Sequence, residues 1–137
     1  MLALVVVGTL ATLAISSYSS YMEKARVATA ELDLSRIESR IETYEIAKSQ
    51  LPSSLAQIGE GALLDPWGHP YCYLDFTGLQ GKGRMRKDRN LVPINSDYDL
   101  YSSGADGATL PPLTAQPSQD DVIRANNGGF LGLATDY

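Results

Sequence analysis

The first 22 residues of the chain contain no charged side chain, and from Met1 to Ile15 nearly every residue is apolar. As a helix rising about 1.5 Å per residue, this stretch is roughly 33 Å long, which matches the ~30 Å hydrocarbon core of a bilayer. No basic residue precedes the apolar run, as one would in a cleaved signal peptide. The pattern predicts a helix that can lie in a membrane.

Apolar residues then recur at alternating spacings of three and four, which is typical of an amphipathic helix. The positions are Val27, Ala30, Leu34, Ile37, Ile41 and Tyr44. Neither proline nor glycine separates this segment from the apolar run, and Pro52 is the first residue that stops it. One helix of about 45 residues, some 70 Å long, is therefore expected. Its first half is apolar all round, so it must lie in lipid or be surrounded by copies of itself.

The remainder of the chain predicts a small, turn-rich head. We expect a helical turn at Ser54–Ile58, strands at Tyr71–Phe76 and Tyr98–Ser102, and a basic hairpin tip at Gly78–Asn90. After Gly107, three prolines at 111, 112 and 117 favour irregular structure. The expected fold class is α+β: a long N-terminal helix packed on a small antiparallel sheet of two or three strands, with a loop-rich C-terminal region. Residues 1–24 form the hydrophobic helix and residues 25–137 the head.

Composition narrows the function classes. The net charge is −5, so nucleic acid is not an expected partner. Cys72 is the one cysteine, which excludes an intrachain disulfide and a Cys-rich zinc site. His69 is the one histidine, and neither a nucleophile beside it nor a glycine-rich phosphate loop is visible in the sequence. We therefore expect a protein that is not an enzyme.

Five basic residues crowd into positions 82–89, and they have two main interpretations. They form a solvated loop, or they dock onto an acidic neighbour such as the Glu38/Glu42 stripe of the long helix. The docking charges would be Arg84, Arg86, Lys87 and Arg89, with Glu38 and Glu42 as their partners. A DNA grip is disfavoured, because no set of stacking aromatic residues lies in the loop.

Three motifs carry a family resemblance. The segment Ala14-Ile-Ser-Ser-Tyr18-Ser-Ser-Tyr21 resembles the N-terminal helix of type IVa pilins. The segment Asp65-Pro-Trp-Gly-His-Pro-Tyr71 is similar to a signature of the major pseudopilin of type II secretion systems. Asp97-Tyr-Asp-Leu-Tyr-Ser-Ser-Gly-Ala-Asp106-Gly resembles the later strand and glycine–aspartate turn of that pseudopilin. The resemblance covers nearly the whole chain.

This resemblance implies a subunit whose hydrophobic helices bundle into a filament core with the heads outward. The residues expected to pack in that core are Leu2, Leu4, Val6, Val7, Leu10, Leu13 and Ile15. The implied partners are copies of the chain, the inner membrane before assembly, and the secretion or pilus assembly machinery. The filament is either a periplasmic type II secretion pseudopilus or an extracellular type IV pilus (fimbrium). The competing interpretation is a membrane-anchored periplasmic or extracellular binding module that never polymerises.

The chain also departs from the family pattern. Aligning Gly8 with the family's glycine places Met1 near the seventh mature residue, so the family's N-methylated phenylalanine and fifth-position glutamate are expected to precede Met1. Ser16 replaces the family's helix-kinking proline, and a single cysteine cannot close the disulfide loop of many type IVa pilins.

The resemblance also implies a calcium ion that fixes the C-terminal loop. By comparison with major pseudopilins, its ligands would be Asp106, Asp120 and Asp121, with Ser103 and Ser118 where backbone carbonyl ligands are expected. Calcium favours six to eight hard oxygen ligands, and weak sites suffice outside the cell. From the residues alone, the spacing is not that of an EF-hand, and three aspartates in a loop are more often turn formers or helix caps.

Overall fold

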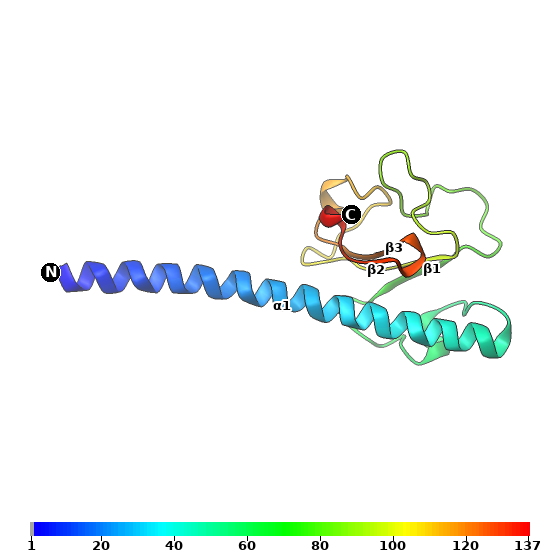
Figure 1. Ribbon diagram of the computed structural model, residues 1–137, viewed down its shortest axis with the longest axis horizontal. Coiled ribbons are helices and arrows are strands. Elements are labelled where there is room, and N and C mark those ends of the chain that lie inside the picture. The colour runs from blue at the N-terminus through cyan, green and yellow to red at the C-terminus, as the bar shows by residue number, and fades with distance from the viewer. Residues whose placement is uncertain (1) are drawn as a thin grey trace.

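The computed structural model describes residues 2–137, so the helical prediction for Met1 lies outside the described residues. A single helix, α1 (Leu2–Lys48), runs through the first third of the chain and packs on the head only through its C-terminal half (Figure 1). It ends where Ser49 adopts the left-handed conformation with φ of 57°, three residues before Pro52. The predicted long helix and its end are confirmed.

The predicted seam is the face that α1 buries. Ala30, Leu34, Ile37 and Ile41 are fully buried, and Val27 packs against their edge. Leu32 lies two positions away from Leu34 on the opposite side and is 73% exposed. The spacing of three and four therefore identified the head-facing side of the helix.

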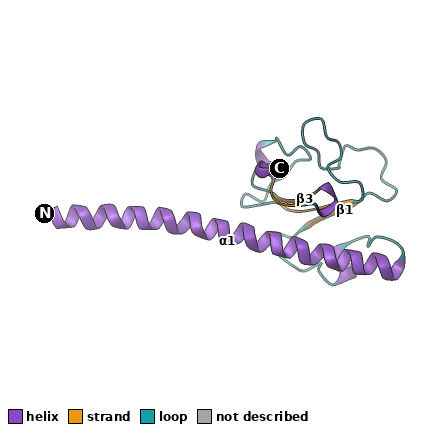
Figure 2. Cartoon of the chain, viewed as in Figure 1, coloured by secondary structure: helices purple, strands orange, loops and turns teal. Residues whose placement is uncertain are grey.

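Four short strands form one antiparallel sheet in the order β1-β2-β3-β4 (Figure 2). The strands are β1 (Cys72–Asp75), β2 (Tyr98–Ser102), β3 (Val122–Ala125) and β4 (Phe130–Leu133). Tyr73 pairs with Leu100 between the first two strands, and Ile123 pairs with Gly132 between the last two. The α+β class is thus the observed one, and β1, β2 and the short helix at Leu55–Ile58 lie where the sequence predicted them.

The expectation of irregular structure after Gly107 is correct as far as Asp121 but wrong for residues 122–133. Two strands, β3 and β4, lie there, and they bring the sheet to four strands instead of two or three. The three prolines all precede β3 and do not interrupt it. Asn126 and Asn127 adopt the left-handed conformation and let the chain reverse tightly between the two strands.

Both faces of the sheet are covered. On one face, Tyr98, Leu100 and Val122 pack against α1. On the other face, Ile123 and Ala125 pack beneath Ile94 and Leu113, which belong to the long segments 76–97 and 103–121. The head therefore has three layers: the helix, the sheet, and a layer of irregular chain.

One buried arginine joins the first two layers. Arg124 of β3 donates to Glu38 of α1 at 2.6 Å and to Asp97 at 2.9 and 2.8 Å. Its guanidinium carbon lies 4.0 Å from the centre of the Tyr98 ring, and its side chain is 3% exposed. Because every partner is fixed by an element of the head, Arg124 sets how the sheet sits on the helix.

Candidate functional site

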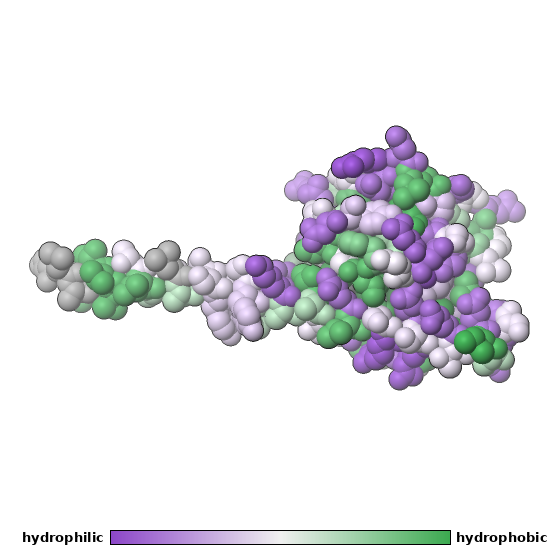
Figure 3. Space-filling view, viewed as in Figure 1, coloured by the Kyte–Doolittle hydropathy of each residue, from purple (hydrophilic) through white to green (hydrophobic). Residues whose placement is uncertain are grey.

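The candidate site is the part of α1 that extends beyond the head, residues 4–21, called here the protruding segment. It lies clear of the sheet and the loops along its whole length (Figure 1), and every described side chain in it is exposed. In the space-filling view its described part is green, hence hydrophobic, at the N-terminal end and pale toward the head (Figure 3). An apolar surface of this kind has no partner within the described chain.

Five of the predicted core-packing residues lie on this segment: Leu4, Val6, Val7, Leu10 and Ile15. Their exposures run from 50% for Val6 to 83% for Leu4, and Val5, at 66%, is exposed on the side of the helix that these five leave open. The side chains of Leu2 and Leu13, also predicted to pack there, lie outside the described residues. Burying an aliphatic side chain of this size contributes about 1.5–3 kcal/mol, so five of them represent roughly 10 kcal/mol of unused association energy.

Three hydroxyl groups of the protruding segment are already hydrogen-bonded within the helix. Thr9 donates to the carbonyl of Val6, and Thr12 donates to that of Gly8, both at 2.9 Å. Ser19 donates to the carbonyl of Ser16 at 3.0 Å. A polar group buried without a partner costs free energy, and these three hydroxyls avoid that cost in any apolar surrounding.

The same segment satisfies the length and composition of a membrane span. α1 contains a window of mean hydropathy 1.4, and none of that window is buried in the head. The helix is thus long and apolar enough to cross a bilayer, and a bundle of identical helices would present it with a similarly apolar environment.

The aspartates proposed for calcium are only partly brought together. The amide of Asp106 donates to the carboxylate of Asp120 at 3.0 Å, which places these two residues side by side. Asp121 points elsewhere: it is buried and its Oδ2 atom accepts from Arg86 and from Thr109. Ser103 is also buried, and the hydroxyl of Ser118 bonds the backbone of Leu110 in both directions. Within residues 2–137, no group of three or more His, Cys, Asp or Glu side chains is arranged to hold a metal ion.

The docking charges separate into two groups. Arg84 and Arg89 are exposed, Lys87 is half-buried, and Glu42 is exposed on α1, so these four are placed for contact with another molecule. Glu38 is engaged by Arg124 within the same chain. Arg86 is 2% exposed and cannot reach another subunit, so its assignment as a docking residue is wrong. Its partner Asp121 lies 35 residues further along the chain, and no local pattern signals such a pair.

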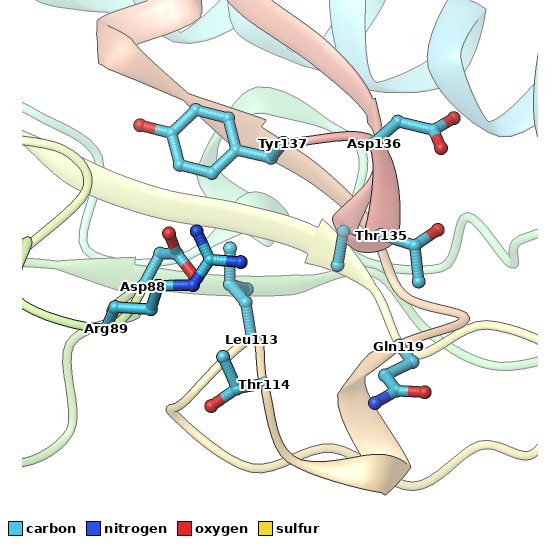
Figure 4. Close-up of a pocket in the computed structure, with 9 residues that line it drawn as sticks. Asp88, Arg89, Leu113, Thr114, Gln119, Thr135, Asp136 and Tyr137 are labelled. Atoms are coloured by element: carbon cyan, nitrogen blue, oxygen red, sulfur yellow. The ribbon is translucent and has the colours of Figure 1, made fainter.

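The head has a hollow of about 400 Å³ that is lined by residues 88–89, 113–114, 119 and 134–137 (Figure 4). Its lining side chains are polar or charged in the main, and none of them is histidine, cysteine or serine. His69 lies elsewhere, with Nδ1 3.1 Å from the carbonyl oxygen of Gly104. Cys72 is half-buried in β1, where burial raises the pKa of its thiol. The described residues therefore do not assemble a nucleophile–base pair in this hollow.

No family model, curated protein or solved structure matches the chain. Function therefore has to be inferred from the geometry of α1 and from the three sequence motifs.

Proposed function

We propose that this chain is a structural subunit of a helical filament of the type IV kind and that the protruding segment is its polymerising element. The observation that supports this most strongly is the exposure of an apolar helix on all sides, with three of its hydroxyl groups hydrogen-bonded internally. A membrane span alone accounts for the apolar surface. The three motifs, which extend into the head, favour assembly.

In the proposed mechanism, the protruding segment first holds the subunit in the inner membrane with the head outside. It then leaves the lipid and packs among the same segments of other subunits. Different faces of one helix meet in neighbouring subunits, so the contact is heterologous and the symmetry is open and helical. Apolar burial at roughly 25 cal/mol per Å² drives polymerisation, and no catalytic step is involved.

Two kinds of filament are compatible with this proposal. The Asp65–Tyr71 and Asp97–Asp106 motifs favour a type II secretion pseudopilus in the periplasm. The Ala14–Tyr21 motif favours a surface pilus. The exposed Arg84 and Arg89 and the half-buried Lys87 would meet acidic groups such as Glu42 of a neighbouring subunit in either case, which makes assembly sensitive to ionic strength.

The test places one charge in the protruding segment. Leu10→Lys should abolish filaments, because an ammonium group would be buried among apolar helices without a partner. Ser39→Lys is the matched control, since it adds the same charge to an exposed site of the same helix beside the head. Filaments sheared from cells are imaged by electron cryomicroscopy, and circular dichroism checks the fold of the head.

Normal filaments from the Leu10→Lys variant would refute the proposal. If the unaltered chain yields only monomers in membrane or detergent, the anchored binding module is the better description. If Ser39→Lys also abolishes filaments while the head stays folded, added charge by itself is responsible and the protruding segment is not specifically implicated.

A further inference from the structure

Arg86 is the one buried residue among the five basic residues at positions 82–89, and it contacts both ends of the segment 109–121. Its Nη2 donates to the carboxylate of Asp121. Its Nη1 donates to the hydroxyl of Thr109 at 2.5 Å and to the carbonyl oxygen of Leu110 at 2.8 Å. The guanidinium carbon lies 4.3 Å from the centre of the Tyr101 ring. One cation thus gathers a carboxylate, a hydroxyl, a carbonyl and an aromatic face.

These are oxygen donors of the kinds that a calcium ion would recruit, but a side chain of the protein already holds them. The carboxylate of Asp121 has Oδ2 on Arg86 and Thr109, and its Oδ1 is buried with no hydrogen-bond partner in the described chain. The carboxylate of Asp106 accepts from the amide of Ala108 in its own turn, and the carboxylate of Asp120 accepts from the amide of Asp106. The donor set implied by the pseudopilin resemblance does not converge on a shared position, so it does not fit a calcium ion.

We propose that the guanidinium of Arg86 takes the place of a metal ion in the C-terminal loop and holds the segment 103–121 on the sheet without calcium. Guanidinium stays charged throughout the physiological pH range, and its planar fork matches a carboxylate on one side and a carbonyl on the other. A chelator cannot remove it. The inference concerns the isolated head and does not rest on the proposed function.

The backbone around Arg86 is built to deliver this cation. The amide of Arg86 donates to the buried carboxylate of Asp99 at 2.6 Å, and its carbonyl accepts from Ile94 at 3.0 Å. The adjacent Lys87 exchanges two backbone hydrogen bonds with the proline segment, to Pro111 at 3.0 Å and from Leu113 at 2.9 Å. These bonds hold Leu113 over the sheet face that lies away from α1, where it packs with Ile94 and Ile123. Backbone hydrogen bonds between Lys87 and residues 111–113 therefore help to hold the layer of irregular chain in place.

A tight fit in the loop supports the same conclusion. Gly104 has a φ of 65°, and a Cβ at this position would overlap the backbone of Asp120. The two ends of the segment 103–121 are thus in direct contact at Gly104, and Arg86 joins residues 109, 110 and 121 further in. Both contacts close the loop without any added group.

The first experiment measures the thermal unfolding of the full chain in detergent, with millimolar calcium and with a chelator. The melting temperatures are expected to agree within about 2 °C, because a ligand that does not bind the folded state adds no stability. Calorimetric titration with calcium alone should give no binding heat above that of dilution. A calcium-dependent rise of several degrees would overturn the proposal.

The second experiment replaces the cation. Arg86→Met, which leaves Asp121 buried and unpaired, should lower the melting temperature by about 10 °C or more. Arg84→Met is the matched control, since Arg84 is exposed in the same loop, and it should change the melting temperature by less than about 2 °C. Equal effects of the two substitutions would contradict the proposed role of Arg86.

If Arg86→Met does not fold, amide hydrogen exchange of the unaltered chain decides the question. The amides of Leu110 and Leu113, which donate to Ser118 and Lys87, should stay protected when calcium is chelated. Loss of their protection in chelator would show that a metal, and not Arg86, holds the loop.

Discussion

The indole nitrogen of Trp67 lies 3.0 Å from the carboxylate of Glu23 and donates a hydrogen bond to it. Glu23 is the first charged residue of the chain and begins the part of α1 that meets the head. Trp67 stands on a turn whose amides, at Trp67 and His69, donate to the buried carboxylate of Asp65 at 3.1 and 2.8 Å. The turn therefore grips α1 at the point where the protruding segment leaves the head.

Trp67→Phe keeps an aromatic ring and removes this hydrogen bond. We expect a loss of roughly 1–2 kcal/mol in the free energy of unfolding, because the acceptor is charged and half-buried. Denaturant unfolding in detergent measures the loss. Tyr44→Phe is the control, since it removes a longer, uncharged hydrogen bond of 3.3 Å to Gln57 and should cost less. Equal losses would mean that the Trp67–Glu23 contact has no special weight.

Arg124→Met should destabilise the head by roughly 3–5 kcal/mol, because it leaves Glu38 and Asp97 without the buried cation that they share. Arg36→Met provides the comparison. Arg36 is half exposed, and its partner Glu60 keeps a second arginine, Arg40, at 2.6 Å. A loss below about 1 kcal/mol is expected there. Similar unfolding midpoints for the two variants would contradict the proposed role of Arg124 in joining the sheet to α1.

Two leucines about half a turn apart on α1 distinguish the buried face from the exposed one. Leu34→Ala removes a fully buried side chain from the core and should cost about 2–5 kcal/mol. Leu32→Ala removes the same group from a site that is 73% exposed, and its cost should stay within about 0.5 kcal/mol for the monomer. A large effect of Leu32→Ala on monomers would show that the outer face of the helix has a contact within the chain.

Buried phenols make the head sensitive to alkali. Burial raises the pKa of the Tyr101 hydroxyl to about 12, and the nearby Cys72 adds to this, whereas Arg86 lowers it in part. The unfolded phenol ionises near 10, so the folded state binds the proton more tightly, and the stability due to Tyr101 is lost as the pH rises from about 10 to about 12. Burial likewise raises the pKa of Tyr71, Tyr73 and Tyr98.

Ultraviolet titration of tyrosinate, run in parallel with circular dichroism, tests this prediction. Part of the phenols should ionise only together with the loss of structure. Tyr101→Phe should lose less stability than the unaltered chain over the same pH interval. An unchanged slope in that variant would show that Tyr101 does not contribute to the alkaline transition.

The fold was predictable wherever one local pattern decides the structure. The seam from Val27 to Tyr44 identified both the helix and its buried side, and aromatic runs identified β1 and β2. The strands β3 and β4 were missed because the upstream prolines suggested irregular chain through to the C-terminus. The signal that could have found them is Asn126-Asn-Gly-Gly129, a composition typical of a hairpin turn, between two four-residue runs that each contain three apolar residues.

The candidate site was predictable for a different reason. An apolar run without charge identifies the protruding segment, because its chemistry is local. Arg86 and Arg84 look alike in the sequence, yet one is buried and the other exposed. Only the approach of residues 109–121, set by the whole fold, separates them. The same holds for Asp121, whose partner could not be inferred from its spacing to Asp106 and Asp120.

Because α1 has no break between Leu4 and Ile41, any tension applied to its free end passes along a continuous ladder of backbone hydrogen bonds into the head. There it acts as a sliding load on four fully buried apolar side chains and on the Arg124–Glu38 ion pair. The protruding segment and the buried face of α1 belong to one continuous helix, so they respond to force as one unit. Pulling α1 away from the head therefore requires disrupting the core. A force transmitted from subunit to subunit would be borne by the best-packed region of each subunit.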